Sequence, residues 1–222
     1  MHIPDGYISP QTGGLFYLVM APLWYAASRI VKRNLKARQV PYLAFGAGFA
    51  FIIMMFNVPI PGGSTGHAVG GTLVAVLLGP WAAMIAITVA LVVQALLFGD
   101  GGVTAIGANC FNMAFALPFA GYYIYRIVGA RSAKNSMRRA VGAGVGAYFG
   151  LVLAALLTGI EFGVQPILYH SADGKALYCP YGLGVALPVM LLEHILLFGW
   201  IEAIVTFLVI RYLQKEDASL II

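Results

Sequence analysis

The chain has 222 residues, of which 61% are hydrophobic and only 9% are charged. Because about a quarter of the residues in soluble domains are charged, this composition excludes an ordinary soluble enzyme and predicts an all-α integral membrane protein. The formal net charge of +5 is interpreted as a signal of membrane topology and not of nucleic-acid binding. Two cysteines are too few to define a disulfide or a metal cluster.

Seven apolar runs occupy nearly the whole chain, and a membrane-spanning helix needs roughly 20 apolar residues. We therefore predict a bundle of seven transmembrane helices that forms one domain over residues 1–222. The expected spans are Gly14–Val31, Tyr42–Phe56, Gly66–Leu78, Trp81–Phe98, Thr104–Ile127, Ala140–Ile160 and Val185–Tyr212.

The basic residues support this number of spans. All but one of the 13 lysines and arginines follow the first, fifth or seventh expected span: Arg29, Lys32, Arg33, Lys36, Arg38, Arg126, Arg131, Lys134, Arg138, Arg139, Arg211 and Lys215. Seven spans place this whole set on one side of the membrane, and only Lys175 lies elsewhere. The positive-inside rule makes that side cytoplasmic. We expect the N-terminus outside and the C-terminus in the cytoplasm.

The N-terminal tail, residues 1–13, begins with Met1-His2, and no cleavable signal peptide is visible. Histidine is a bulky second residue, so we expect the initiator methionine to be retained and its amine to be free after deformylation. The amine of Met1, the backbone nitrogen of His2 and the ring nitrogen of His2 can then chelate one ion. Square-planar nitrogen ligands suit Ni(II) or Cu(II). The alternative is that a histidine at position 2 is chance.

The stretch 57–67, which reads NVPIPGGSTGH, is expected to be an irregular loop that leads into a short third span. Its prolines and glycines exclude a regular helix. A third span of thirteen residues reaches only about 20 Å, whereas the hydrocarbon core is about 30 Å thick. His67 opens this span and should therefore lie at membrane depth, on the same side as the N-terminus. We expect it to supply the fourth nitrogen; the alternative is an ordinary turn.

Polar residues near these positions could orient the metal ligands. A metal-bound imidazole usually donates its other N–H to an oxygen acceptor. The candidates are Asn57, Ser64, Thr65, Asn109 and Asn112. Ordinary hydrogen bonds between helices remain the alternative for each of them.

The seventh expected span contains Glu193, His194 and Glu202. Ionisable residues within a membrane are functional candidates. Glu193 and Glu202 are nine residues apart, which is half a turn out of phase in an α-helix, so they are not expected to face one site. We interpret all three as coupling residues or residues of the bundle interior.

Small residues recur at four-residue spacing in the sixth expected span, at Gly142, Gly146 and Gly150. Such faces let helices approach closely in a membrane. They could pack within the chain, which is the commoner case, or against another membrane subunit.

Three segments together resemble the CbiM/NikM family, the substrate-binding membrane components of energy-coupling-factor nickel and cobalt transporters. They are MHIPDGYISP at the N-terminus, NVPIPGGSTGHAVGGTLVAVLLGPWAAMIAITVALVVQALLFGDGGVTAIGANCFNMA, and EHILLFGWIEAIVT near the C-terminus. The resemblance covers the chain from end to end. It implies that the metal is held by the terminal amine of Met1, by the backbone and side chain of His2, and by His67.

The resemblance also implies the substrate and the partners. Ni(II) is the expected transported substrate, because a low-spin d8 ion prefers planar nitrogen ligands, and Co(II) is the alternative; no organic cofactor is expected. The implied partners are a transmembrane coupling subunit, a pair of cytoplasmic ATPases and a small membrane subunit. Because no fused C-terminal extension follows, the small subunit is expected to be a separate chain or absent. The implied location is the plasma membrane of a prokaryote, in contact with lipid and not with nucleic acid.

Two other functions stay open at this point. A stand-alone divalent-metal permease or channel would need a continuous polar path, and the cytoplasmic halves of the spans are nearly free of polar residues. A membrane-embedded enzyme would have to use Glu193, His194 and Glu202, which the helical phase disfavours. No phosphate-binding loop and no set of nucleophile and base is visible, so we expect no enzymatic activity.

Overall fold

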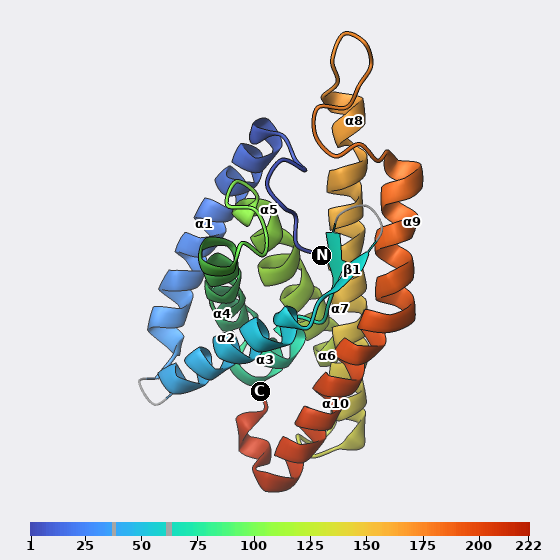
Figure 1. Ribbon diagram of the computed structural model, residues 1–222. Helices are drawn as coiled ribbons and strands as arrows, with labels where there is room; N and C mark the ends of the chain where they lie inside the picture. Colours follow the sequence, from blue (N-terminus) through green and yellow to red (C-terminus); the bar gives the residue numbers. More distant parts are fainter. Residues whose placement is uncertain (37–38, 61–63) are drawn as a thin grey trace.

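Helices form most of the chain in the computed structural model, which describes residues 1–36, 39–60 and 64–222 (Figure 1). The α-helices are α1 (Pro10–Asn34), α2 (Val40–Met55), α3 (Gly71–Leu78), α4 (Pro80–Val93), α5 (Ile106–Asn109), α6 (Leu117–Val128), α7 (Met137–Gly163), α8 (Gln165–Leu168), α9 (Leu183–Glu193) and α10 (Gly199–Glu216). Three segments are π-helices, η2 (Gln94–Phe98), η3 (Cys110–Ala116) and η4 (His194–Phe198), and a 3-10 helix, η5 (Ala218–Leu220), follows α10.

Four helices are long and apolar enough to cross a membrane by themselves. They are Pro10–Asn34, Pro80–Phe98, Met137–Leu168 and Leu183–Glu216, and they correspond to the first, fourth, sixth and seventh expected spans. Helix α2 is apolar but shorter. The fifth expected span is a continuous helical run that consists of α5, η3 and α6. The chain is thus a membrane protein of mainly helical structure.

The third expected span is shorter than predicted, and its start is wrong. The helix begins at Gly71 and has 8 residues, so His67 does not open it but lies in the preceding coil. The reason is Gly70, whose φ of 75° is left-handed and ends any helix that would extend backwards. His67 is therefore held by irregular backbone at a bundle-facing position and not by a helix.

The described residues of the stretch 57–67 are not helical, as predicted, but they form a short hairpin where an irregular loop was expected. Strands β1 (Val58–Ile60) and β2 (Ser64–Gly66) pair in antiparallel fashion, with Val58 opposite Gly66 and Pro59 opposite Thr65. Residues 61–63 of this stretch, like Arg38 of the first basic cluster, lie outside the described residues. The strands place β-branched residues beside turn-forming ones, which favours a short hairpin over helix.

The small-residue face of α7 packs within the chain, against α6. A methyl group added to Gly146 would come within 2.3 Å of the carbonyl oxygen of Gly121, and one added to Gly150 would come within 2.7 Å of that of Leu117. The two backbones are therefore in contact, as expected of small residues at a helix interface in lipid.

The basic clusters gather around the C-terminus of the chain. Lys134 donates to the carbonyl oxygen of Ile221, Arg139 donates to that of Ile222, and Arg211 donates to that of Asn135. The end of α1 joins them, because Asn34, Leu35 and Ile222 line one cavity. The described basic residues that follow the first, fifth and seventh expected spans thus occupy one end of the bundle, opposite the extended loop after α8 (Figure 1).

Candidate metal centre

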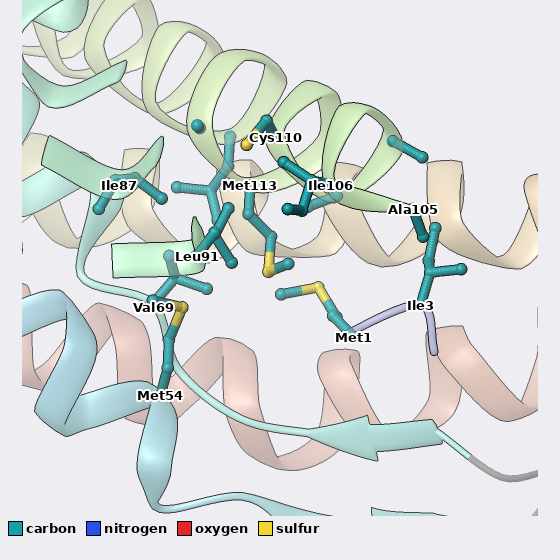
Figure 2. Close-up of a cluster of buried hydrophobic side chains, with 14 of the residues drawn as sticks. Met1, Ile3, Met54, Val69, Ile87, Leu91, Ala105, Ile106, Cys110 and Met113 are labelled. Carbon is teal, nitrogen blue, oxygen red and sulfur yellow. The ribbon is translucent and has the colours of Figure 1, made fainter. Parts of the chain in front are cut away.

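The N-terminal tail runs from α1 back into the bundle, so that the first residue lies beside β1 and not at the surface (Figure 1). Met1 and Ile3 are fully buried, and His2 is 4% exposed. Figure 2 shows the thioether of Met1 pointing toward Met113 in a cluster of apolar side chains that also includes Ile3 and Ala105. Apolar burial of the methionine side chain therefore holds the chain terminus inside the protein.

Backbone hydrogen bonds fasten the tail at Ile3. The side-chain oxygen of Asn109 accepts from the Ile3 N–H at 2.8 Å, and its amide nitrogen donates to the Ile3 carbonyl at 3.2 Å. Gly102 N–H donates to the same carbonyl at 2.8 Å. These three bonds fix the residue that follows His2, and they give the predicted polar residue Asn109 a definite role in positioning the tail.

Asp5 fastens the tail to the loop before α5. Its carboxylate accepts from the backbone N–H of Val103 at 3.1 Å, and from the N–H and hydroxyl of Thr104 at 2.9 Å and 2.5 Å. The bond from the Thr104 hydroxyl is the main cause that lowers the pKa of Asp5 from its usual 3.8. Gly102 permits this approach, because a methyl group there would lie 2.4 Å from the Asp5 backbone nitrogen.

The start of α1 holds the other end of the tail. The N–H of Ser9 donates to the side-chain oxygen of Gln165 at 3.0 Å, and the Ser9 hydroxyl accepts from the N–H of Thr12 as the N-cap of α1. The N–H of Cys179 donates to the carbonyl of Tyr7 at 3.1 Å. The tail is therefore attached along its whole length.

The two histidines singled out in the sequence lie against each other. The rings of His2 and His67 stack with their centroids 4.5 Å apart and an interplanar angle of 25°. The Ser64 hydroxyl donates to the carbonyl of His2 at 3.1 Å and so joins β2 to the tail. The structure thus brings together the second residue of the chain and a residue 65 positions later.

The protonation and the missing hydrogen-bond partners of these ring nitrogens suit metal binding. His67 Nδ1 lies 3.0 Å from the carbonyl of Ala68; since a carbonyl only accepts, we assign the proton to Nδ1 and a lone pair to Nε2. His67 Nε2 and both ring nitrogens of His2 are buried without a hydrogen-bond partner. A ring N–H given to a backbone carbonyl, with the other nitrogen bare, is the usual arrangement of a histidine ligand.

Asp100 places a carboxylate beside His2. Its Oδ1 lies 3.3 Å from His2 Nδ1, without hydrogen-bond geometry, and its Oδ2 accepts from the amide of Asn57 at 3.1 Å. Burial raises the pKa of Asp100, and the amine of Met1 and the Asn57 amide oppose that shift. Asp100 is not among the residues predicted from the sequence, because it lies between two expected spans without a local motif.

The two remaining polar residues predicted to orient the metal ligands, Thr65 and Asn112, have different surroundings. The hydroxyl of Thr65 is buried without a partner. Asn112 donates to Thr158 at 3.1 Å and to Glu161 at 2.7 Å, so it contacts α7 and not the tail. The sequence also gives no signal for Gln94, whose buried amide has no partner and faces the imidazole of His2.

Glu193, His194 and Glu202 lie on a helix that is not uniformly α-helical. The π-helix η4 separates Glu193 from Glu202. The expected half-turn offset between these two residues assumes a constant period of about 3.6 residues, so it does not apply to this helix. Glu202 accepts from the backbone N–H groups of Val69 and Gly70 at 2.7 Å and 2.9 Å. It thereby holds the coil that carries His67, while Glu193 is partly exposed and His194 is buried.

The side chains alone do not form a complete set of metal ligands. Among residues 1–36, 39–60 and 64–222 no group of three or more His, Cys, Asp or Glu side chains could hold an ion. Two imidazoles alone leave a divalent ion with open positions, and the chain terminus beside His2 offers an amine and an amide nitrogen. The arrangement is suited to a nitrogen chelate.

Comparison with known proteins identifies the family. The family model described as the cobalt uptake substrate-specific transmembrane region, CbiM, matches residues 2–220. The chain is 52% identical to a probable fused nickel transport protein, LarMN, of Lactiplantibacillus plantarum, over 97% of this chain and 65% of that protein. It therefore spans slightly less than two thirds of that relative.

Two further comparisons cover most of this chain and most of the protein compared with it. The chain is 45% identical to a putative metal transport protein of Methanocaldococcus jannaschii, over 99% of this chain and 94% of that protein. The crystal structure of a truncated transition metal transporter superposes with a TM-score of 0.93 at 50% identity and covers 97% of this chain and 99% of the other.

Proposed function

We propose, from the premise that the chain belongs to the CbiM family, that it is the metal-binding membrane component of an importer for Ni(II) or Co(II). The ion would be captured from outside by the amine of Met1, the backbone and ring nitrogens of His2, and Nε2 of His67. The observation that carries the proposal is the contact between the buried tail and the coil after the hairpin. There the His2 and His67 rings stack, and both ring nitrogens of His2 and Nε2 of His67 lack partners.

Ni(II) is the preferred substrate in this proposal. Four nitrogens in a plane suit a low-spin d8 ion, while Co(II) more often takes additional ligands. Asp100 supports the choice of a cation, since its carboxylate lies 3.3 Å from the His2 ring. A buried divalent ion needs a nearby negative charge to offset its desolvation.

We also propose the membrane arrangement. The chain acts as one domain with seven spans, in which α2, α3 and the run from α5 to α6 add to the four long helices. The gathering of basic side chains around Ile222 supports a cytoplasmic C-terminus by the positive-inside rule, with the tail opening outward. The membrane would be the plasma membrane of a prokaryote.

The partners are part of the same proposal. A transmembrane coupling subunit and a pair of cytoplasmic ATPases would drive transport, and a small membrane subunit would assist. The name "fused nickel transport protein" of a relative that is longer than this chain supports a second membrane component. The chain itself would bind the ion and perform no catalysis.

The test removes a metal ligand from each of the two segments that supply them, the N-terminal tail and the coil of His67. One residue added before Met1 displaces the amine, and His67→Ala removes the fourth nitrogen. Each change should weaken Ni(II) binding by on the order of 100-fold or more, because even the partners of metal ligands are worth about 10–100-fold. The measurement is isothermal titration of the purified protein in detergent.

Two controls separate the chelate from general damage. His170 is exposed in the loop after α8, so His170→Ala should bind Ni(II) with unchanged affinity, as should a chain tagged at its C-terminus. If the N-terminally extended chain binds with the affinity of the original chain, the chelate model is wrong.

A further inference from the structure

A third buried histidine shares the chemical state of His67. His194 is fully buried, and its Nδ1 lies 2.7 Å from the carbonyl oxygen of Met190. Since that carbonyl can only accept, the proton is on Nδ1 and the lone pair is on Nε2. His194 Nε2 has no partner. A buried acceptor without a partner is unfavourable, so packing alone gives no reason for an imidazole here.

The backbone around His194 is also unusual. It is the first residue of η4, one of three π-helical segments. Single π turns within α-helices are rare and occur frequently at functional sites. The turn interrupts the run from α9 to α10 at the residue that carries the bare nitrogen.

The segment that carries His194 packs on the coil that carries His67. His194 contacts Phe198 with ring centroids 5.5 Å apart, and the Phe198 ring fills the space where a side chain of Gly66 would lie, 2.1 Å from its Cβ position. Glu202, one turn further, binds the N–H groups of Val69 and Gly70.

The position of His194 along the bundle differs from that of the tail. The junction of α9 and α10 lies between the level of the N-terminus and the end of the molecule that carries the C-terminus (Figure 1). In the proposed orientation this direction leads toward the cytoplasm.

We propose that His194 is a second, transient ligand of the transported ion, which takes it together with His67 when the N-terminal chelate releases it. The inference rests on the proposed function. In this exchange the bonds from the metal to Met1 and His2 break, and the released amine and amide nitrogens take protons from solvent. Nε2 of His194 donates its lone pair, water fills the remaining positions, and no proton has to leave His194.

The exchange is sequential and not simultaneous. His2, His67 and His194 do not form a three-ligand cluster in the described part of the chain, so the ion would meet His194 only after the tail has moved. His67 is the ligand common to both steps. Its coil, tied to Glu202 of the adjacent α10, can stay in place while the tail withdraws.

The test uses the full chain with one residue added before Met1, which blocks the chelate and leaves His67 and His194 intact. Zn(II) is added to protein that is labelled with 15N in its histidines, because this diamagnetic ion shifts the signal of the nitrogen that it binds. The Nε2 signals of His67 and His194 should both shift and those of His170 should not. A shift of His67 alone, or no shift, would overturn the inference.

A binding series gives a second readout with Co(II), whose visible absorption reports imidazole ligands. The extended chain should bind Co(II) weakly, and His194→Gln should lower that residual affinity about tenfold, which is about 1.4 kcal/mol, whereas His170→Ala should leave it unchanged. Residual binding that is indifferent to His194→Gln contradicts the inference. Failure of the proposed function is distinguishable, because then the extension itself leaves Ni(II) affinity unchanged.

Discussion

The two regions that meet at the candidate metal centre are held in opposite ways. In the tail, Ile3 forms a hydrogen bond with α5, Asp5 with the loop before α5, and Ser9 with α8. The coil of His67 depends on one carboxylate, that of Glu202, and on the ring of Phe198. Attachments spread along the chain hold the first region, whereas side chains of one helical segment hold the second.

This difference indicates which half of the centre can move. A segment held by several separate neutral hydrogen bonds can be released stepwise, since each is worth only about 0.5–1.5 kcal/mol. The two adjacent N–H groups of the coil both bind the carboxyl group of Glu202, so the coil should move together with α10. In the proposed exchange the tail is therefore the part that opens, and the coil of His67 is the fixed part.

The largest expected loss of stability and of Ni(II) affinity follows from removing the carboxyl group of Glu202. Glu202→Ala leaves the N–H groups of Val69 and Gly70 without their acceptor. The free energy of unfolding should fall by roughly 3 kcal/mol, because a buried donor left without a partner costs about 1–3 kcal/mol. Ni(II) affinity should fall by about 100-fold as His67 loses its position. Thermal unfolding and titration of the same sample measure both quantities.

Two variants show whether the acceptor role is responsible. Glu202→Gln keeps one oxygen and should retain part of the affinity, and Glu216→Ala, at an exposed position of the same helix, should change neither quantity. Equal binding by Glu202→Ala and the original chain would mean that the coil has another attachment.

A smaller effect is expected where the tail touches the loop before α5. Gly102→Ala adds a methyl group 2.4 Å from the backbone nitrogen of Asp5, so the tail must shift. Overpacking of this kind costs about 1–3 kcal/mol, and Ni(II) affinity should fall about tenfold. The matched control is Gly48→Ala on α2, where no atom lies within 4 Å; a Gly102→Ala protein that binds like this control would refute the close contact.

The smallest expected effect is the pH dependence of the hydrogen bonds that Asp5 accepts from Val103 and Thr104. Because hydrogen bonds lower the pKa of Asp5 in the folded chain below its usual 3.8, its stabilising effect is fully present above that pH and is lost as the pH falls through the lowered value. Hydrogen exchange of the Val103 and Thr104 amides in metal-free protein, corrected for the intrinsic rate, should therefore accelerate below about pH 4. Asp5→Asn should remove this pH dependence, and an unchanged profile would contradict the assignment.

Much of the helical structure was predictable because apolar runs dictate it. Runs of about 20 apolar residues leave few alternatives to spanning helices, and the histidines at positions 2 and 67 were recognisable from the local pattern. The hairpin was not predictable, since its strands have three residues each and a proline-rich stretch reads equally as a loop.

The polar partners of the centre were harder to predict, because they depend on tertiary contacts. Asp100 lies 98 residues from His2, and nothing local marks it as the residue beside that ring. Glu202 was noticed as an ionisable residue in a span, yet its bond to the coil of His67 depends on a π turn, and the apolar pattern does not reveal π turns.

The π turn at η4 also makes the centre sensitive to chain length. A π turn holds one residue more than an α turn, and each residue of an α-helix turns the following face by about 100°. Deletion of one exposed residue within the π turn, such as Leu196 at 69% exposure, would restore an α turn and leave helix α10 in place. Deletion of one residue between η4 and Glu202, such as Ile201, would instead rotate the rest of α10 by about 100°, and the carboxyl group of Glu202 would leave the coil of His67. A one-residue deletion in the α-helix, but not in the π turn, should therefore affect this centre as the loss of Glu202 does.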